Sequence, residues 1–455
     1  MNIPLSAKSE ANMQDSESLA IRGHKIPSIV LDISQKLIRN GYQAFLVGGA
    51  IRDAMLGFQA KDWDVATNAT PEIIRKLFPN ITSFYLKHGT VTLVIRGRHF
   101  EVTTFRAVKG RIGSRLEEDL AHRDFTFNAM AYDIINKKIV DPFGGMQDIK
   151  QRVVRAVLSP LERFSEDPLR MMRAIRFSLE LGYSIEPETL LAVKTMSQTI
   201  DQVAIERVRD EFLKMLVSRK ASAGLDLMRR TGILERVLPE LVEGYRKRQN
   251  NFHKFTIYRH ILVTVDSIER DPVLRLSALF HDIAKPRVRE KSNGRWRFFG
   301  HAAASAELTR EIMVRLKFST EWVTRVASLV ANHMFDYTQD LSDKTIRRFI
   351  KRTGSGNVDD LIKLRKADDL AHGRGKDFES QIEEFKNRVH AQIKKSSAFT
   401  LSDLAANGHD VMRIMGLQPG PKVGQILNQL LEAVVERPEI NQKERLIEVL
   451  EDMKE

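Results

Sequence analysis

The sequence contains no cysteine among its 455 residues. Disulfide bonds, thiolate metal sites and cysteine nucleophiles are therefore excluded. No apolar run approaches the length that a membrane-spanning helix requires. The polar first residues, MNIPLSAKSEANMQDSES, lack the apolar core of a secretory signal. These absences predict a cytoplasmic protein that has no membrane partner.

Acidic residues are also in short supply, because 72 lysines and arginines face only 59 aspartates and glutamates. The formal net charge of +13 suits a polyanionic partner, although charge says nothing about the fold. Hydrophobic residues at 42% and charged residues at 29% are ordinary for a globular protein. A chain of this length exceeds a single core, so we expect several domains. Residues 1–25 are polar, contain few large apolar groups and are predicted to be disordered.

The stretch from Phe45 to Asp64, FLVGGAIRDAMLGFQAKDWD, carries the most specific pattern. A short apolar strand leads into the turn at Gly48 and Gly49, where the missing Cβ atoms let backbone N–H groups approach an anion. Arg52 follows within one helical turn and can reach the same anion, for example a triphosphate. The pattern predicts a nucleotide cradle, with an ordinary turn as the alternative.

Two carboxylates follow on the next predicted strand. Alternate strand residues point to one side, so Asp62 and Asp64 should project together while Trp63 faces away. Such a pair forms a hard-oxygen clamp for Mg2+. Glu101, in HFEVTTF, can complete a two-metal site of the kind used for phosphoryl displacement. A solvated strand end and a surface glutamate are the alternatives.

The predicted elements of the first third are mixed. Helices are expected over 27–40 and over 71–78, the second with Thr70 as its N-cap and Pro71 at its first position. Strands are expected at AFLV, WDVAT, TVTLVIRG, HFEVTTF and MAYDII.

An apolar helix that includes Phe125, Phe127 and Met130 is expected at the end of this region. From Asp148 onward helical periodicity dominates, apart from a ribbon near 296–299. The fold class predicted is α+β, a small sheet domain followed by a long helical body.

A second informative stretch is FSEDPLRMMRAIRF, which reads as a helix. Arg170, Arg173 and Arg176 recur every three residues along one flank, where they can line a groove for a triphosphate or a base. Asp167 and Arg170 lie one turn apart and offer an acceptor and donors that can read a base edge. An ordinary helix with salt bridges is the alternative.

Histidines recur in an ordered series further along the chain, at His260, His281, His301 and His333. Asp282 follows His281 directly, and neutral imidazoles with a carboxylate suit a transition-metal ion such as Mn, Fe, Co or Ni. Asp368 can supply a further carboxylate. A scaffold without metal is the alternative.

Two basic runs lie in the same region, KPRVREKSNGRWR at 285–297 and KTIRRFIKR at 344–352. They predict contacts to a phosphate backbone. Solvated helix or loop faces are the alternative.

The block GGAIRDAMLG…KDWDVATNATPE resembles the signature of the tRNA nucleotidyltransferase and bacterial poly(A) polymerase superfamily. EVTTFR, EDPLRMMRAIRF and the tail pattern NGHD…GLQPGPKVG are similar to later motifs of its CCA-adding members. The resemblance implies a polymerase-β-like head at 26–147, a helical neck at 148–250, an HD-type helical domain at 251–375 and a helical tRNA-binding tail at 376–455.

The resemblance also implies roles for residues of the head. The aspartates that match Asp62 and Asp64 bind the catalytic metals, here expected to be Mg2+, and Glu101 joins them as a catalytic residue. The arginine that matches Arg123 contacts the nucleotide. The matching asparagine, Asn128, helps to shape the site.

In the same family the residues that match Asp167 and Arg170 act as a protein template for CTP and ATP. Arg173 and Arg176 are then expected to support the triphosphate or the base. Gly48, Gly49 and Arg52 complete the nucleotide-binding set.

The context HDIAKP is similar to the HD metal phosphohydrolases and to the HD domain fused to some bacterial tRNA nucleotidyltransferases. The resemblance implies metal ligands at His260, His281, Asp282 and His333. The hydrolytically active versions tend to carry Asp after the last histidine, whereas Met334 stands here, which puts hydrolysis in doubt.

The function implied is template-independent addition of CMP to the 3′ end of tRNA, with tRNA and CTP as partners. Nine residues separate Arg106 from Leu116, where full CCA-adding relatives carry a longer loop, and this favours a CC-adding enzyme. Full CCA addition with ATP as a second nucleotide stays open. The alternatives are a poly(A) polymerase that adds AMP to RNA and an HD-type phosphohydrolase as the principal activity.

Overall fold

The structure is a computed structural model that describes residues 26–60, 62–79, 81–86, 89–106, 115–249, 255–373, 377–395 and 398–454. Two compact units make up this part of the chain. The first unit consists of the chain up to Glu211 together with Leu227–Arg236. The second unit consists of Phe212–Asp226 together with the chain from Val237 onward. The predicted disorder of residues 1–25 and the short loop at 107–114 lie outside the described residues.

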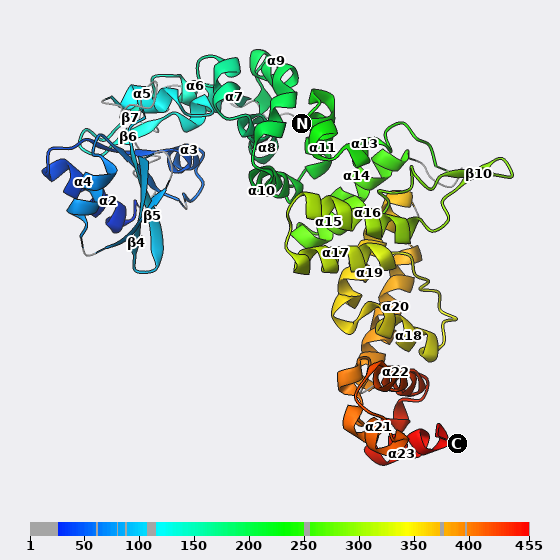
Figure 1. Cartoon of the computed structure of the whole chain (residues 1–455). Helices are drawn as coiled ribbons and strands as arrows, with labels where there is room; N and C mark the ends of the chain where they lie inside the picture. Colours follow the sequence, from blue (N-terminus) through cyan, green and yellow to red (C-terminus); the bar gives the residue numbers. More distant parts are fainter. Residues whose placement is uncertain are drawn as a thin grey trace, which may run out of the picture. The chain divides into compact units, whose positions relative to one another are not determined.

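The first unit contains a seven-stranded sheet of order β3-β4-β5-β2-β1-β6-β7 (Figure 1). Strands β2 and β5 run parallel, and the other neighbouring pairs are antiparallel. The strands are β1 (Ala44–Val47), β2 (Asp64–Thr67), β3 (Thr82–Leu86), β4 (Thr90–Ile95), β5 (Arg98–Thr104), β6 (Ala131–Asp133) and β7 (Lys138–Val140).

Helices α2 (Ser28–Arg39) and α4 (Pro71–Leu77) cover one face of this sheet (Figure 1). They bury Val30, Ile33 and Ile74 against apolar strand residues. The Thr70 hydroxyl accepts a hydrogen bond from the Ile73 N–H at 3.4 Å, so the predicted cap is confirmed. The helices α3 (Gly49–Met55) and α5 (Leu116–Ala121) complete the head.

The expected strands at AFLV, TVTLVIRG and HFEVTTF are confirmed with shifts of one or two residues at their ends. The strand predicted from Trp63 begins at Asp64. Strands β3 and β7 were not predicted. They lie at the two edges of the sheet, where pairing on a single side gives a weak local signal.

The helix predicted through Phe125, Phe127 and Met130 is wrong. Only a 3-10 turn, η3 (Thr126–Asn128), forms there, and β6 follows it. The Asp124 carboxylate accepts from the Phe125 N–H at 2.9 Å and from the Asn128 side chain at 2.9 Å. This local bonding competes with helical hydrogen bonds, and the strand pairing of β6 with β1 takes the rest of the segment.

Short helices follow the sheet and form the neck. A two-residue parallel pairing joins β8 (Val153–Val154) to β9 (Ser184–Ile185). The helices are α6 (Gly145–Gln151), α7 (Pro160–Glu166), α8 (Leu169–Leu181), α9 (Pro187–Met196), η4 (Ser197–Gln202), α10 (Ile205–Leu216), α11 (Ala221–Thr231), α12 (Leu234–Val237) and α13 (Pro239–Val242).

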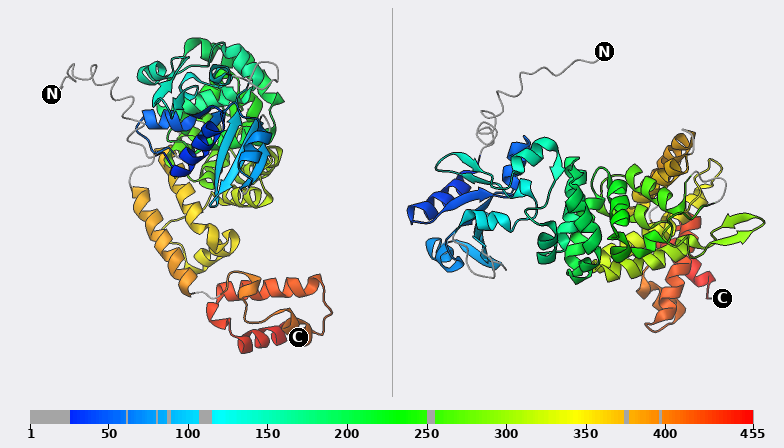
Figure 2. Two further views of the ribbon diagram at one scale, coloured as in Figure 1. Left: turned by 90° about the vertical axis from the view of Figure 1, so that its left-hand side faces the viewer. Right: turned by 90° about the horizontal axis from the view of Figure 1, so that it is seen from above.

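The second unit is helical apart from a two-stranded ribbon (Figures 1 and 2). The ribbon consists of β10 (Glu290–Ser292) and β11 (Arg295–Arg297), which confirms the one predicted near 296–299. The helices are α14 (Ile257–Ser267), α15 (Pro272–Phe280), α16 (His301–Arg315), α17 (Thr320–Asn332), α18 (Asp343–Thr353), η5 (Ser355–Asn357), α19 (Val358–His372), α20 (Asp377–Lys395), η6 (Leu401–Asp403), α21 (Gly408–Met415), α22 (Pro421–Glu436), η7 (Pro438–Ile440) and α23 (Lys443–Asp452).

The last of these helices pack around their own apolar core, which includes Val411, Leu430 and Leu446. In the described part of the chain, no helix combines the length and the apolar character that a membrane crossing needs.

Candidate functional site

Carboxylates from two strands meet at one end of the β2–β5 pair. Because Val65 lies opposite Val102 in this parallel pairing, Asp64 and Glu101 are neighbours on the same face of the sheet. Asp62 stands two residues before Asp64, outside the strand and exposed. Trp63 is buried in the core of the head, as predicted. The structure therefore brings the three predicted carboxylates together.

Electrostatic repulsion acts within this group. Burial, the Glu101 charge and the Asp62 charge raise the pKa of Asp64 to about 7, although Arg123 acts in the opposite direction. A cation would remove the repulsion and keep Asp64 ionised. The donor set fits a hard divalent ion, since it consists of carboxylate oxygens.

Gly48 brings the backbone close to these groups. Its φ of 81° is unfavourable for other residues, and a Cβ there would lie 3.1 Å from Arg123 Nη1 and 3.3 Å from Asp64 Oδ2. Arg123 pairs with Asp119 at 3.3 Å, and its buried Nε has no hydrogen-bond partner among the described residues. Burial raises the pKa of Asp119, but Arg123 and Arg106 outweigh it and hold that pKa below its usual value. The Arg123 guanidinium and the Asp64 carboxylate thus both lie beside the Gly48 turn.

A chain of hydrogen bonds joins Arg52 of α3 to Arg173 of α8, and we call it the Arg52–Arg173 relay. Arg52 Nη1 donates to Asn128 Oδ1 at 2.8 Å, and Asn128 Nδ2 donates to Asp124 Oδ1 at 2.9 Å. Arg173 donates to Asp124 Oδ2 through Nε at 2.8 Å and Nη2 at 2.6 Å. Burial opposes ionisation, but Arg173 and Asn128 lower the pKa of Asp124 to about 2.

Asp53 holds the other side of the Arg52 guanidinium. Arg52 Nε and Nη2 donate to Asp53 Oδ1 at 2.9 and 2.7 Å. The carboxylate and the Asn128 amide together fix the plane of the guanidinium, while the second N–H of each terminal nitrogen forms no hydrogen bond with the described residues. Arg52 is therefore oriented before any nucleotide arrives.

Three guanidinium groups surround the ring of Phe177 in α8. Arg52, Arg173 and Arg176 lie 5.1, 5.3 and 4.1 Å from its centroid. Arg176 is buried and donates to Glu211 at 2.5 Å and to Glu180 at 2.6 Å. These contacts make Arg176 a link between neck helices, and its nucleotide-binding role stays a prediction.

The predicted base-reading pair is held by other groups. Arg170 Nη2 donates to the His122 carbonyl at 2.7 Å, and Arg170 Nη1 donates to Glu166 at 3.0 Å. Asp167 pairs with Arg207 of α10 at 2.8 Å. Sequence reasoning missed Arg207, because nothing local indicates that α10 lies beside Asp167.

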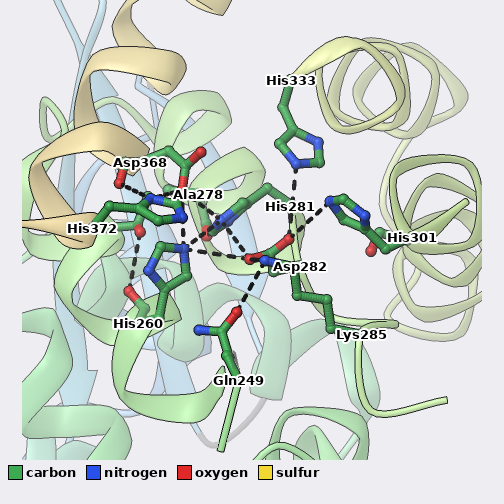
Figure 3. A network of polar contacts seen from close by, with 12 residues as sticks. Gln249, His260, Ala278, His281, Asp282, Lys285, His301, His333, Asp368 and His372 are labelled. Atoms are coloured by element: carbon green, nitrogen blue, oxygen red, sulfur yellow. Dashed lines mark hydrogen bonds and ion pairs between the residues drawn. The ribbon is translucent and has the colours of Figure 1, made fainter. Parts of the chain in front are cut away.

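A second candidate site lies in the helical unit, where histidines and carboxylates from five segments meet (Figure 3). The four predicted ligands come together there, and Asp368, the further carboxylate expected from the sequence, lies among them. Sequence reasoning missed His372, although its spacing of four residues from Asp368 places both on one face of α19. The group, called the histidine cluster below, consists of His260, His281, Asp282, His301, His333, Asp368 and His372.

Asp282 lies at the centre of the histidine cluster. Its Oδ2 is 3.3 Å from His260 Nε2 and 3.2 Å from His281 Nε2. Its Oδ1 is 3.5 Å from His301 Nε2 and 3.8 Å from His333 Nε2. Ligand atoms around one six-coordinate ion are separated by about 3 Å, so these spacings suit metal ligands that share Asp282.

The rings of the histidine cluster are oriented by backbone carbonyls. The Nδ1 atoms of His281, His301 and His333 lie 2.7 to 2.8 Å from the carbonyls of Ala278, Phe298 and Val330. A carbonyl only accepts, so Nδ1 carries the hydrogen and Nε2 faces the cluster. The same arrangement holds metal-binding histidines in their required tautomer.

The pKa of His281 shows that the two buried aspartates, Asp282 and Asp368, favour positive charge beside them. Burial opposes protonation of His281, but Asp282 and Asp368 raise its pKa to about 10. Burial and the His281 charge lower the pKa of His333 to about 3. Asp282 Oδ1, His301 Nε2 and His333 Nε2 are buried without hydrogen-bond partners among the described residues. The residues therefore fit a metal ion.

Three stretches of the chain match protein-family models. Residues 44–155 match the Poly A polymerase head domain. Residues 182–244 match an RNA- and SrmB-binding site of polymerase A, and residues 289–450 match tRNA nucleotidyltransferase domain 2.

Two relatives cover nearly the whole chain. The CCA-adding enzyme of Anoxybacillus flavithermus is 31% identical over 432 residues, which are 92% of this chain and 95% of the relative. The A-adding tRNA nucleotidyltransferase of Deinococcus radiodurans is 35% identical over 410 residues, 86% of this chain and 91% of the relative. The chain belongs to the tRNA nucleotidyltransferase family, which includes both of these relatives. It is an enzyme.

The solved structures agree with this membership. The CCA-adding enzyme of Bacillus stearothermophilus in complex with CTP has a TM-score of 0.71 at 27% identity and covers 94% of this chain and 98% of its own. The predicted fold class, an α+β head followed by a helical body, is confirmed. The domain boundaries, the site residues and the HD-type assignment stay predictions.

The Arg52–Arg173 relay makes a testable prediction. Asn128→Ala removes the group that connects Arg52 to Asp124, so Arg52 loses its orientation while the carboxylates stay in place. We expect the KM for the nucleotide to rise about tenfold, the equivalent of one or two lost charge-assisted hydrogen bonds, with a smaller change in kcat. Steady-state kinetics of nucleotide incorporation measure both constants.

Asn136→Ala is the matched control, because the Asn136 amide donates to Asp133 at 2.8 Å on the exposed side of the β6–β7 turn. It should leave the KM unchanged. Equal constants for Asn128→Ala and the natural enzyme would contradict the role of the relay.

Proposed function

We propose that the chain is a template-independent tRNA nucleotidyltransferase that adds CMP to the 3′ end of tRNA in a reaction that depends on Mg2+. The observation that carries the proposal is the meeting of Asp62, Asp64 and Glu101 beside Gly48 and Arg123. The curated relatives are named for CCA or A addition, and one solved relative is described in complex with CTP.

The carboxylates would hold Mg2+, which when bound supplies positive charge to the reacting phosphate and lowers the pKa of the attacking 3′-hydroxyl. Arg123 faces the same point across Gly48 and can neutralise phosphate oxygens. Arg52, oriented by Asp53 and the relay, offers its remaining N–H groups to the triphosphate.

The base would be read by the neck. Arg170 is anchored on the His122 carbonyl and Asp167 on Arg207, so both side chains have a defined direction before binding. A base edge that bonds to both selects its nucleotide by hydrogen-bond pattern rather than by a nucleic-acid template. The relay ties this helix, α8, to the arginine that binds the triphosphate.

The loop that follows Arg106 bears on which nucleotides are added and on how many. The short loop at 107–115 favours a CC-adding enzyme, and residues 107–114 lie outside the described structure. The A-adding relative makes addition of a single A a competing outcome. Full CCA addition and poly(A) synthesis are the remaining alternatives. Cytoplasmic location stays a prediction from the sequence.

Product sizing tests this proposal. The purified protein and Mg2+ are incubated with tRNA that lacks its CCA end and with tRNA that ends in CC, and CTP, ATP or both are supplied. We expect two C residues to be added to the first tRNA and no addition to the second. Asp62→Ala should abolish addition and leave the circular dichroism spectrum unchanged, because Asp62 is exposed and outside β2.

Each other product contradicts part of the proposal. A complete CCA end would show that the short loop suffices for A addition. One A on the CC-ending tRNA alone would identify an A-adding enzyme, and long A tails would identify a poly(A) polymerase. Retained activity in Asp62→Ala would refute the metal assignment.

A second activity is supported by the histidine cluster. We propose that it holds a transition-metal ion and forms a metal-dependent phosphohydrolase centre in the helical unit, although Met334 stands where hydrolytically active HD domains tend to carry Asp. The buried lone pairs of Asp282 Oδ1, His301 Nε2 and His333 Nε2, which lack hydrogen-bond partners among the described residues, carry this proposal. A metal there supplies a Lewis acid for a phosphate ester, and Lys285, 2.5 Å from Asp282, is positioned near the same point.

Metal analysis tests this second proposal. Protein purified without chelator should contain Mn, Fe, Co or Ni, and Asp282→Asn should lose the metal, because Asp282 contacts both sets of histidines. Nucleotide addition by the head should persist in this variant. Hydrolysis of p-nitrophenyl phosphate should require the metal. Metal-free protein after supplementation with each ion would refute the centre, and loss of transfer in a folded Asp282→Asn would refute its independence.

A further inference from the structure

The two basic runs of the helical unit differ in what surrounds them. In α18, Lys344 and Arg348 pair with Glu436 at 2.6 Å, and Lys351 pairs with Glu432 at 2.5 Å. These acidic partners belong to α22. The run predicted to contact phosphate therefore joins two helices of the same unit.

Arg347 also joins α18 to α22. Its Nε donates to the Val435 carbonyl at 2.7 Å and its Nη2 to the Glu436 carbonyl at 2.9 Å. The guanidinium thus satisfies the free carbonyls at the end of α22 and complements the helix dipole.

The ribbon β10–β11 is different. Lys291, Arg295 and Arg297 are exposed, and none of them forms an ion pair with a carboxylate in the described parts of the chain. Glu290 is the single acidic residue between 289 and 300. The ribbon therefore presents net positive charge that the protein does not neutralise.

Aromatic rings alternate with these cations. The Arg289 guanidinium lies 3.4 Å from the centroid of Trp296, and the Arg297 guanidinium lies 5.6 Å from that of Phe299. Phe299 is 66% exposed. Exposed rings flanked by cations are the combination on which unpaired bases stack while their phosphates are neutralised.

The ribbon borders the histidine cluster. A cavity of about 790 Å3 is lined by Arg295, Trp296 and Phe299 from the ribbon side and by His301 and His333 of the cluster. Ligand pockets are typically of about 300 to 1,000 Å3, so a nucleotide unit fits this volume. The histidine cluster, which Figure 3 shows from close by, therefore shares this cavity with residues of the ribbon.

We propose that the ribbon β10–β11, together with Phe299, is a binding surface for single-stranded RNA. Lys291, Arg295 and Arg297 contact its phosphates, and Phe299 stacks on a base. The surface belongs to the helical unit, whereas the nucleotide site belongs to the unit that contains the head. Its binding of RNA does not depend on the proposed phosphohydrolase, although it would bring a phosphodiester chain to that centre.

Fluorescence anisotropy of the full chain with a labelled, unstructured RNA decamer tests the proposal over a range of KCl concentrations. The variant with Lys291, Arg295 and Arg297 changed to Gln should bind at least tenfold more weakly. Its slope of log K against log salt should fall by about 2, since each phosphate contact on a single strand contributes about 0.7. Phe299→Ala should weaken binding about tenfold without changing that slope, because it removes stacking alone.

The matched control changes Lys344, Arg348 and Lys351 to Gln, which removes the same charge from α18. It should lower the melting temperature and leave the salt slope unchanged. Equal loss of binding in the two triple variants would overturn the proposal, because net charge would then explain it. Equal affinity for a blunt duplex, insensitive to Phe299→Ala, would overturn the preference for single strands, and absence of binding by the natural chain would overturn the surface itself.

Discussion

The burial of Asp64 beside Glu101 and Asp62 is the constraint on which the head depends, because burial and like charge both oppose ionisation of Asp64 and raise its pKa. The parallel pairing of β2 with β5 fixes the backbone of Asp64 beside that of Glu101, and the neighbouring residues Val65 and Val102 anchor both strands in the apolar core of the head. An ordinary surface would let such charges move apart into water. Here the fold holds them, so the free energy of the apo head contains an unfavourable term that a cation removes. The carboxylates are therefore held in the positions from which they can bind a cation before the cation arrives.

Cationic groups around the carboxylates are treated differently. Arg52, Arg123 and Arg173 each have a carboxylate or amide partner that fixes their direction. Orientation costs conformational entropy, and the protein meets this cost during folding rather than during nucleotide binding. The Arg52–Arg173 relay carries the same order from the sheet domain into the neck, since Asp124 accepts bonds from both sides.

The histidine cluster follows the same principle with softer ligands. Backbone carbonyls at Ala278, Phe298 and Val330 orient the imidazoles. The lone pairs that converge on Asp282 are buried, so water cannot satisfy them at low cost. Two preformed cation sites thus occur in separate units of one chain.

Much of this could be predicted from local sequence. The Gly48–Gly49 turn, the Thr70 cap and the main strands depend on neighbours within a few residues, and their patterns are specific. Alternation also predicted that Trp63 faces away from Asp62 and Asp64, and Trp63 is buried in the core although β2 begins only at Asp64. The proximity of Asp64 and Glu101 needs the β2–β5 register, which depends on pairing across 37 residues that no local pattern encodes.

Other features depend on partners that are distant in sequence. The apolar spacing of Phe125, Phe127 and Met130 resembled a helix, but the Asp124 side chain and pairing with β1 decided otherwise. Two similar basic runs have different surroundings because acidic residues of α22 lie beside one of them. His372 was missed because its partner Asp368 is informative only once α14 and α15 pack on α19.

The most direct test of the central claim is the pH dependence of stability in Asp64→Asn, measured by thermal unfolding in buffer with a metal chelator. Asp64 has a pKa of about 7 in the folded chain against an ordinary value of 3.8. The folded state therefore retains a proton that the unfolded chain has lost, and its stability decreases as pH rises through this interval. Asn cannot ionise, so the variant should match the natural protein at about pH 4 and exceed it increasingly towards about pH 8.

The same variant should lose at least about 100-fold in the rate of nucleotide addition, since a ligand for the catalytic cation is gone. Greater stability at high pH together with lost activity would establish a strained cation site used for catalysis. Equal melting temperatures at every pH, or full activity in Asp64→Asn, would contradict the account.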